Sequence, residues 1–122
     1  MFIKINELNE NDITIDVRTV SEFNNFTIFK YNIPIINEAQ HKRIKKFYPT
    51  AIPIILYALI KNKETIKKDL LKVSNHGKRK IIVGCSRGRL RSPIMCLYAR
   101  MLGIKCKVLY RGIKRFKNNN VT

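Results

Sequence analysis

The sequence predicts a single α/β domain in which a small parallel sheet is flanked by helices on both faces. The apolar run Ile81-Ile82-Val83 is typical of a strand buried on both faces, and Val108-Leu109-Tyr110 is a second run of this kind. Helix start and stop signals lie between the two runs, so a βαβ unit fits into about thirty residues. The 122 residues, 45% of them hydrophobic, can bury one core.

The N-terminal part also predicts sheet and helix in alternation. Alternating apolar residues over 13–17 predict a strand that enters a turn at Arg18. Thr19 and Glu22 have the spacing of a capping box, so we expect a short helix to begin there. Residues 31–34 form a brief extended segment that a proline closes.

Three further helices are expected in the middle of the chain. Asn37 can cap a strongly basic helix over 38–48, which Pro49 ends. A second helix, over 51–60, is apolar on nearly every side. A third, over 64–74, should pack on the sheet through one stripe, which consists of Ile66, Leu70 and Val73.

The helix of the βαβ unit has clear boundaries. Ser92 is the expected N-cap, Pro93 the first helical residue and Gly103 the left-handed stop. One face of this helix carries apolar residues, namely Ile94, Leu97 and Met101. We expect one domain over 1–117 and a frayed tail over 118–122.

The charge of the chain is large and uneven. Lys and Arg number 25 against 8 acids, which gives a net charge of +17. Residues 1–69 hold all eight acids, whereas 70–122 hold fourteen bases and no acid. A field of one sign attracts phosphates, nucleic acid or anionic substrates. A basic surface that is merely solvated is the alternative, but it leaves the missing acids unexplained.

Several classes of protein are disfavoured by simple patterns. The longest apolar run, 51–60, contains a proline and has about half the length of a membrane span, so no membrane helix is expected. No secretory signal is visible, which makes the cytoplasm the expected compartment. Three Cys without a C-x-x-C pair, and only two His, indicate neither disulfides nor a metal site. No bound cofactor is expected.

The loop 84–92 is the candidate site, because it joins a parallel strand to a helix whose free amides can face an anion. Cys85 lies at the strand end beside three Arg, an environment that stabilises a thiolate, so we expect it to be the nucleophile. An inert core thiol is the alternative, and it is our expectation for Cys96 and Cys106. The residues expected to hold the anion are Ser86, Arg87, Gly88, Arg89, Arg91 and Ser92.

Two families share the pattern of this loop. Cys, five residues, Arg and then Ser or Thr resembles the protein tyrosine phosphatases, and Cys85 to Ser92 fits it. Those enzymes usually have His before the Cys, where this chain has Gly84. They also need a general-acid Asp, whereas Asp69 falls in a predicted helix.

The second resemblance covers nearly the whole chain. Asp-Val-Arg at 16–18, Glu-Phe at 22–23 and Asn-Ile-Pro at 32–34 occur in the order of the rhodanese-like domains. Five residues rather than four separate Cys85 from the Arg, and Cys-x-Arg-Gly-x-Leu-Arg-Ser resembles the rhodanese domains of tRNA 2-selenouridine synthases. The segment 111–115 is similar to the Gly-Tyr-Lys segment of that family.

This resemblance implies an enzyme that replaces the sulfur of wobble 2-thiouridine in tRNA with selenium, with selenophosphate as co-substrate, Cys85 as the essential thiol and a geranylated intermediate. The family also carries a P-loop domain, and this sequence contains no Gly-x-x-x-x-Gly-Lys-Ser/Thr. We therefore expect a stand-alone rhodanese subunit that works with a separate P-loop subunit. Asp16, Arg18 and Glu22 are interpreted as structural support, with Arg18 paired to Glu22.

Three alternatives remain open from the sequence. Cys85 could serve a general sulfurtransferase or sulfur carrier through a persulfide, or a cysteine phosphatase. The chain could also be a basic RNA-binding module in which Cys85 is idle. We expect most aromatic residues to fall at core positions, which would leave no platform for unstacked bases and would assign base selection to the partner.

Overall fold

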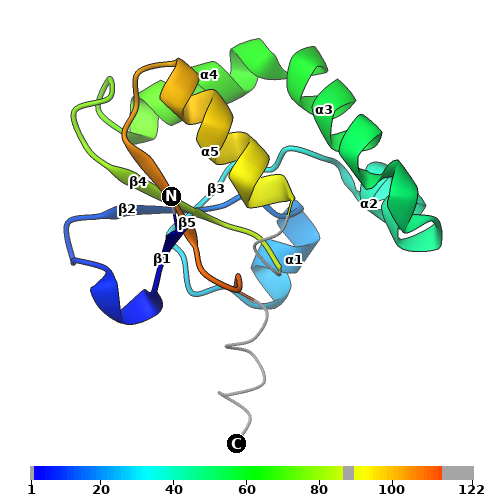
Figure 1. Ribbon diagram of the computed structural model, residues 1–122, viewed down its shortest axis with the longest axis horizontal. Helices are drawn as coiled ribbons and strands as arrows, with labels where there is room; N and C mark the ends of the chain where they lie inside the picture. The colour runs from blue at the N-terminus through cyan, green and yellow to red at the C-terminus, as the bar shows by residue number, and fades with distance from the viewer. Residues whose placement is uncertain (1, 87–89, 114–122) are drawn as a thin grey trace, which may run out of the picture.

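The computed structural model describes residues 2–86 and 90–113, and a five-stranded parallel sheet forms its centre (Figure 1). The strand order is β1-β5-β4-β2-β3, and all the neighbouring pairs are parallel. The α/β fold with a parallel sheet, predicted from the sequence, is therefore confirmed. The strands are β1 (Phe2–Ile3), β2 (Ile13–Asp16), β3 (Tyr31–Asn32), β4 (Ile81–Gly84) and β5 (Cys106–Leu109).

The helices lie close to the predicted ranges, and both capping boxes form. Thr19 Oγ1 accepts a hydrogen bond from the Glu22 amide, and Asn37 Oδ1 accepts one from the Gln40 amide at 2.8 Å. The helical elements are η1 (Ile5–Glu7), α1 (Val20–Asn25), α2 (Glu38–Lys46), η2 (Tyr48–Thr50), α3 (Ala51–Lys61), α4 (Lys63–Val73) and α5 (Arg91–Met101). No helix within residues 2–86 and 90–113 has the length and apolar character that a membrane span needs.

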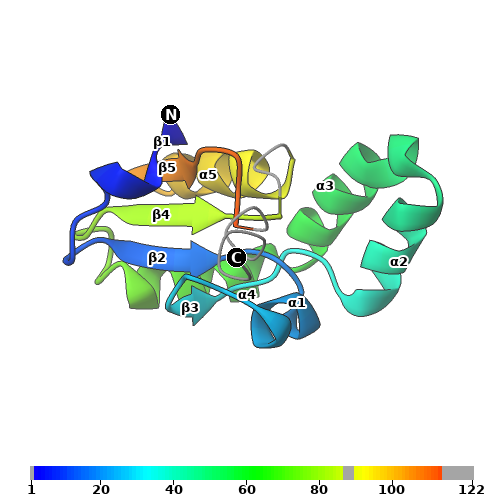
Figure 2. The same cartoon turned by 90° about the horizontal axis from the view of Figure 1, so that it is seen from below.

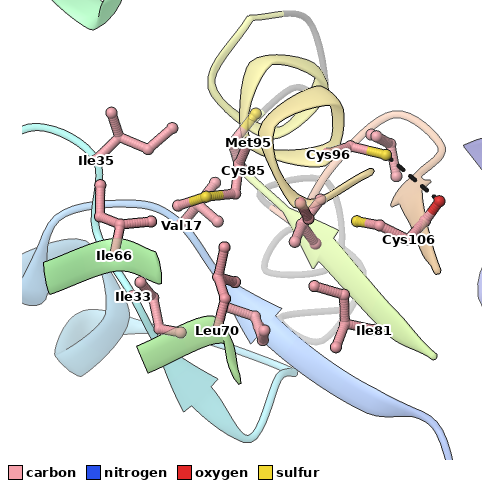
Figure 3. Close-up of a cluster of buried hydrophobic side chains, with 14 of the residues drawn as sticks. Val17, Ile33, Ile35, Ile66, Leu70, Ile81, Cys85, Met95, Cys96 and Cys106 are labelled. Atoms are coloured by element: carbon pink, nitrogen blue, oxygen red, sulfur yellow. Dashed lines mark hydrogen bonds between the residues drawn. The ribbon is translucent and has the colours of Figure 1, made fainter. Parts of the chain in front are cut away.

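The two faces of the sheet are covered unequally. On one face, Ile66 and Leu70 of α4 and Met95 of α5 pack on β2, β4 and β5 in the main core (Figure 3). A smaller cluster covers the opposite face, where Ile82 and Leu109 meet side chains from η1 and the end of α1. Each fully buried Ile or Leu stabilises the fold by about 1.5–3 kcal/mol, so the main core provides most of the stability.

Helix α5 differs from the sequence prediction in two respects. It begins at Arg91, and Leu90 is its N-cap, so the prediction of Ser92 as the cap is wrong and Ser92 lies within the first turn. The apolar face that carries Ile94, Leu97 and Met101 is also not the buried face of the helix, because Leu97 is exposed and Met101 is 83% exposed. The buried residues of α5 are Arg91, Ser92, Met95, Cys96 and Ala99. Several of these are small, which lets the helix lie close to β4 and β5.

Helices α2 and α3 extend the domain beyond the sheet. Figure 2 shows both helices lying past the arrowheads of β2 and β4, at the carboxyl end of the strands. Helix α2 ends at Lys46, and Pro49 belongs to η2, the short turn that leads into α3. Only the side of α3 that carries Ala51, Ile55 and Ala58 is buried. The apolar sequence of α3 therefore leaves an exposed outer side.

Gly112 lies where the segment after β5 packs closely against the loop that carries Cys85. The Ile113 amide donates to the Cys85 carbonyl at 2.8 Å. Gly112 has a φ of +77°, and a Cβ there would lie 2.5 Å from the carbonyl oxygens of both Cys85 and Ser86. Glycine is therefore required at this position both for its backbone conformation and for space.

We expect Gly112→Ala to destabilise the fold more than Gly103→Ala. Gly103 follows the end of α5 with a φ of +84° and has nothing within 4 Å of an added Cβ. Gly103→Ala therefore measures only the cost of placing alanine in a left-handed conformation, about 1–2 kcal/mol. Gly112→Ala adds a backbone clash to that cost. Urea unfolding of both variants measures the difference, and equal losses would show that the two chain segments are not in close contact.

Candidate functional site

An open cavity of about 500 Å³ lies at the carboxyl end of the sheet. Parallel strands end at the same edge, and Asp16 at the end of β2 is paired in register with Gly84 at the end of β4. Cys85 follows β4 directly and reaches the cavity. The lining consists of Arg18, Glu22, Asn25, Phe26, Ile36, His41, Ile44, Lys45, Tyr48, Ala51, Ile55, Cys85, Ser86, Leu90 and Arg91.

Cys85 is a nearly buried thiol that belongs to the main core (Figure 3) and also lines the cavity. Its side chain is 3% exposed, and its sulfur lies 3.2 Å from the hydroxyl oxygen of Ser92. Ser92 is fully buried in the first turn of α5. Two predicted site residues are thus in contact, and the Ser92 hydroxyl can donate a hydrogen bond to the sulfur when the thiol is ionised.

The Glu22 carboxylate connects the elements around Cys85. Arg91 NH1 donates to Glu22 Oε1 at 2.8 Å, and Ser86 Oγ donates to Oε2 at 2.9 Å. Arg91 NH2 also donates to Ser86 Oγ at 3.0 Å, which closes the triangle. Thr19 contributes its amide and its hydroxyl to Oε1. The loop after β4, the start of α5 and helix α1 are therefore held together by one carboxylate.

The predicted ion pair between Arg18 and Glu22 is wrong. Arg18 pairs with Asp16 instead, with NH2 donating to Oδ2 at 2.8 Å and Nε donating to Oδ1 at 3.0 Å. Thr27 Oγ1 donates to the same carboxylate at 2.9 Å, and Arg18 NH2 also donates to the Phe26 carbonyl. Asp16 is fully buried beside Arg18, whereas Glu22 forms its ion pair with Arg91. The Asp16–Arg18 pair therefore connects the turn after β2 to residues 26 and 27.

His41 is a lining residue that the sequence analysis missed. It belongs to α2, and its Nδ1 lies 3.7 Å from Glu22 Oε1. Burial lowers the pKa of His41, and although Glu22 opposes this change, Arg91 and Lys45 reinforce it. Burial therefore favours the neutral form of the imidazole. The cap at Asn37 predicted the helix, but only the fold brings His41 to the cavity.

The opposite wall of the cavity is apolar and comes mainly from α2, η2 and α3. It includes Phe26, Ile44, Tyr48 and Ile55. The expectation that aromatic residues fall mostly in the core is wrong, because Phe2, Phe47, Tyr48, Tyr57 and Tyr110 are all exposed. Most of these residues lie at the edge of the sheet or beyond it, so no other element covers them.

The cavity retains one lining cation without an ion pair within the described ranges. Asp16 compensates Arg18 and Glu22 compensates Arg91, whereas no carboxylate of the described residues pairs with Lys45. The predicted anion ligands Arg87, Gly88 and Arg89 lie outside the described residues, as does the tail 118–122. Among the described residues, Lys45 therefore contributes the uncompensated positive charge of the lining.

The other two thiols are core residues, as predicted. Cys96 is fully buried and Cys106 is 3% exposed, and the Cys96 thiol donates to the Cys106 carbonyl at 3.4 Å. Both belong to the main core (Figure 3), and neither lines the Cys85 cavity. Within residues 2–86 and 90–113, no three potential metal ligands come together.

Comparison with known proteins supports the fold. No protein-family model matches the sequence, and no curated protein matches it. A crystal structure from Clostridium difficile 630, described as the N-terminal domain of an ATP/GTP-binding protein, is similar with a TM-score of 0.83. The match covers 100% of both chains at 23% sequence identity, which establishes a shared fold.

The Glu22 network should make stability depend on pH. Burial alone would raise the pKa of Glu22, but the hydrogen bond and charge of Arg91, together with Thr19 and His41, lower it from 4.5 to about 2. A lowered folded-state pKa contributes stability that is present above pH 4.5 and is lost as the pH falls to 2. In urea unfolding, Glu22→Gln should be less stable than wild type at pH 7, and this difference should shrink towards pH 2. A difference that stays constant down to pH 2 would contradict the network.

Proposed function

We propose that this chain is the rhodanese-like catalytic subunit of a tRNA 2-selenouridine synthase, which replaces sulfur by selenium in wobble 2-thiouridine with selenophosphate as co-substrate. The proposal is supported by the position of Cys85, which lies at the carboxyl end of β4 in a cavity with one polar and one apolar wall. Selenophosphate and tRNA are both anions, and the chain carries a net charge of +17.

We assign Cys85 as the nucleophile. The hydroxyl oxygen of Ser92 lies 3.2 Å from the Cys85 sulfur, and we assign Ser92 as the residue that forms a hydrogen bond with it. The anion would be bound by the loop that contains Ser86, Arg87, Gly88 and Arg89, with Arg91 held in place by Glu22. A small anion needs only the polar side of the cavity. The apolar wall suits the ring of a base, so it favours a transfer to tRNA over storage of sulfur alone.

A general sulfur carrier is the second candidate. Cys85 is 3% exposed, and such burial would protect a persulfide from solvent. A phosphatase is less well supported, because it needs a carboxylic acid to protonate the leaving group. The carboxylates of the described residues at this site, Asp16 and Glu22, are both engaged in ion pairs.

The proposed enzyme also needs a nucleotide-binding unit. These 122 residues contain no Gly-x-x-x-x-Gly-Lys-Ser/Thr sequence, so a P-loop would have to come from outside them. The structure of similar fold from Clostridium difficile 630 is described as the N-terminal domain of an ATP/GTP-binding protein. That description supports a P-loop partner for this chain.

We expect Cys85→Ser to abolish selenouridine formation and to leave the fold intact, because serine is nearly isosteric but is a poor nucleophile at neutral pH. Cys96→Ser is the matched control, since this thiol is buried in the core away from the cavity. Selenouridine is measured in tRNA after incubation with selenophosphate and the P-loop partner. Mass spectrometry after thiosulfate treatment distinguishes the selenium enzyme from a general sulfur carrier, because the carrier gains a stable persulfide on Cys85. An active Cys85→Ser protein would refute the assignment.

We expect the chain alone to discriminate poorly between tRNAs and to need the P-loop partner for full turnover. Its phosphate contacts come from a general excess of Lys and Arg, which makes binding strong at low salt and weak at high salt. The tRNA affinity of the chain, with and without the partner, is measured across a salt series together with selenouridine yield. Complete turnover by the isolated chain would show that no second subunit is required.

A further inference from the structure

We propose that Phe47 and Tyr48, together with Lys45 and Lys46, form a stacking platform for unpaired bases of an RNA strand at the mouth of the Cys85 cavity. The identification of that strand as tRNA rests on the proposed function. The binding of single-stranded RNA to this platform is a separate property, and it can be tested without any chemistry at Cys85.

The first observation is the exposure of the two rings. Phe47 is 62% exposed and Tyr48 is 58% exposed, although they are adjacent in the chain and large. Tyr48 also lines the cavity that contains Cys85, so one ring belongs to both the surface and the site. Exposed aromatic faces beside a reactive cavity are the feature that sequence-tolerant binding of single strands requires.

The second observation is that the backbone under the rings is well fixed. Tyr48–Thr50 form η2, and Pro49 restricts the backbone in the middle of this turn. The Thr50 amide and hydroxyl both donate to the Phe47 carbonyl, at 3.0 and 2.6 Å. A base that stacks on these rings therefore orders little additional backbone, which favours binding.

The third observation is the charge around the platform. The last turn of α2 carries Arg43, Lys45 and Lys46, and all three are exposed. The acid of α2, Glu38, lies in the first turn, where both its oxygens accept hydrogen bonds from Ser21. Cations can thus contact backbone phosphates while the rings contact bases, and this combination favours RNA over a protein partner.

Tyr48→Trp provides a direct test, because the chain contains no tryptophan and the new indole would be the sole reporter. The variant is titrated with a single-stranded uridine-rich RNA heptamer at low salt, without selenophosphate. We expect strong quenching of the indole fluorescence as bases stack on it. Tyr57→Trp is the matched control: Tyr57 is 55% exposed and lies 5.9 Å from the Lys61 ammonium, but it does not line the cavity. Its fluorescence should change little.

Affinity measurements separate stacking from charge. Tyr48→Ala should weaken RNA binding about 5- to 150-fold, with an unchanged dependence on salt, and Tyr48→Phe should restore it. Lys46→Gln should reduce the slope of log affinity against log salt by about 0.7. Circular dichroism confirms that each variant is folded.

Two results would overturn the proposal. One is wild-type RNA affinity for Tyr48→Ala, and the other is equal quenching of the tryptophans at 48 and 57. Either result would leave this surface to a protein partner. Because the RNA titration also works with Cys85→Ser protein, failure of the selenium reaction would not affect it. Stacking without selenouridine formation would refute the proposed function alone.

Discussion

The Glu22 carboxylate is the interaction on which the geometry of the site depends. It accepts hydrogen bonds from Thr19 in its own helix cap, from Ser86 after β4 and from Arg91 at the start of α5. Helix α1 and the two sides of the Cys85 loop, more than sixty residues further along the chain, therefore share one partly buried anion. Removing one partner of such a network leaves an uncompensated charge, which is costly in a partly buried position. The network therefore joins Ser86 and Arg91 to each other and to α1.

A second constraint acts beneath that loop. The backbone of 111–113 passes so close to Cys85 and Ser86 that only glycine fits at 112, and the Ile113 amide binds the Cys85 carbonyl. The thiol is thus supported from the C-terminal side as well as by the Glu22 network. Both supports act on the backbone and on neighbouring side chains, which leaves the sulfur itself in contact with Ser92 and the cavity.

The pair α2 and α3 explains why the cavity has two different walls. The loops after β2 and β4, together with α1 and the start of α5, provide most of the polar lining. Helices α2 and α3 and the turn η2 provide most of the apolar lining, and α2 adds His41 and Lys45. Phe47 and Tyr48 lie in the turn between these helices, and they remain exposed although they are aromatic. The same arrangement that encloses Cys85 therefore also creates an exposed aromatic and basic surface beside it.

Features that depend on neighbours in the chain could be predicted from the sequence. The caps at Thr19 and Asn37, the βαβ order and the place of Cys85 after a buried strand were all predictable, because backbone hydrogen bonding and strand burial act locally. Tertiary structure decided the pairing of Arg91 with Glu22, 69 residues away, the inward face of α5 and the exposure of the aromatic residues. These features depend on which surfaces meet in three dimensions, and periodicity along one segment carries no information about the surface that faces it.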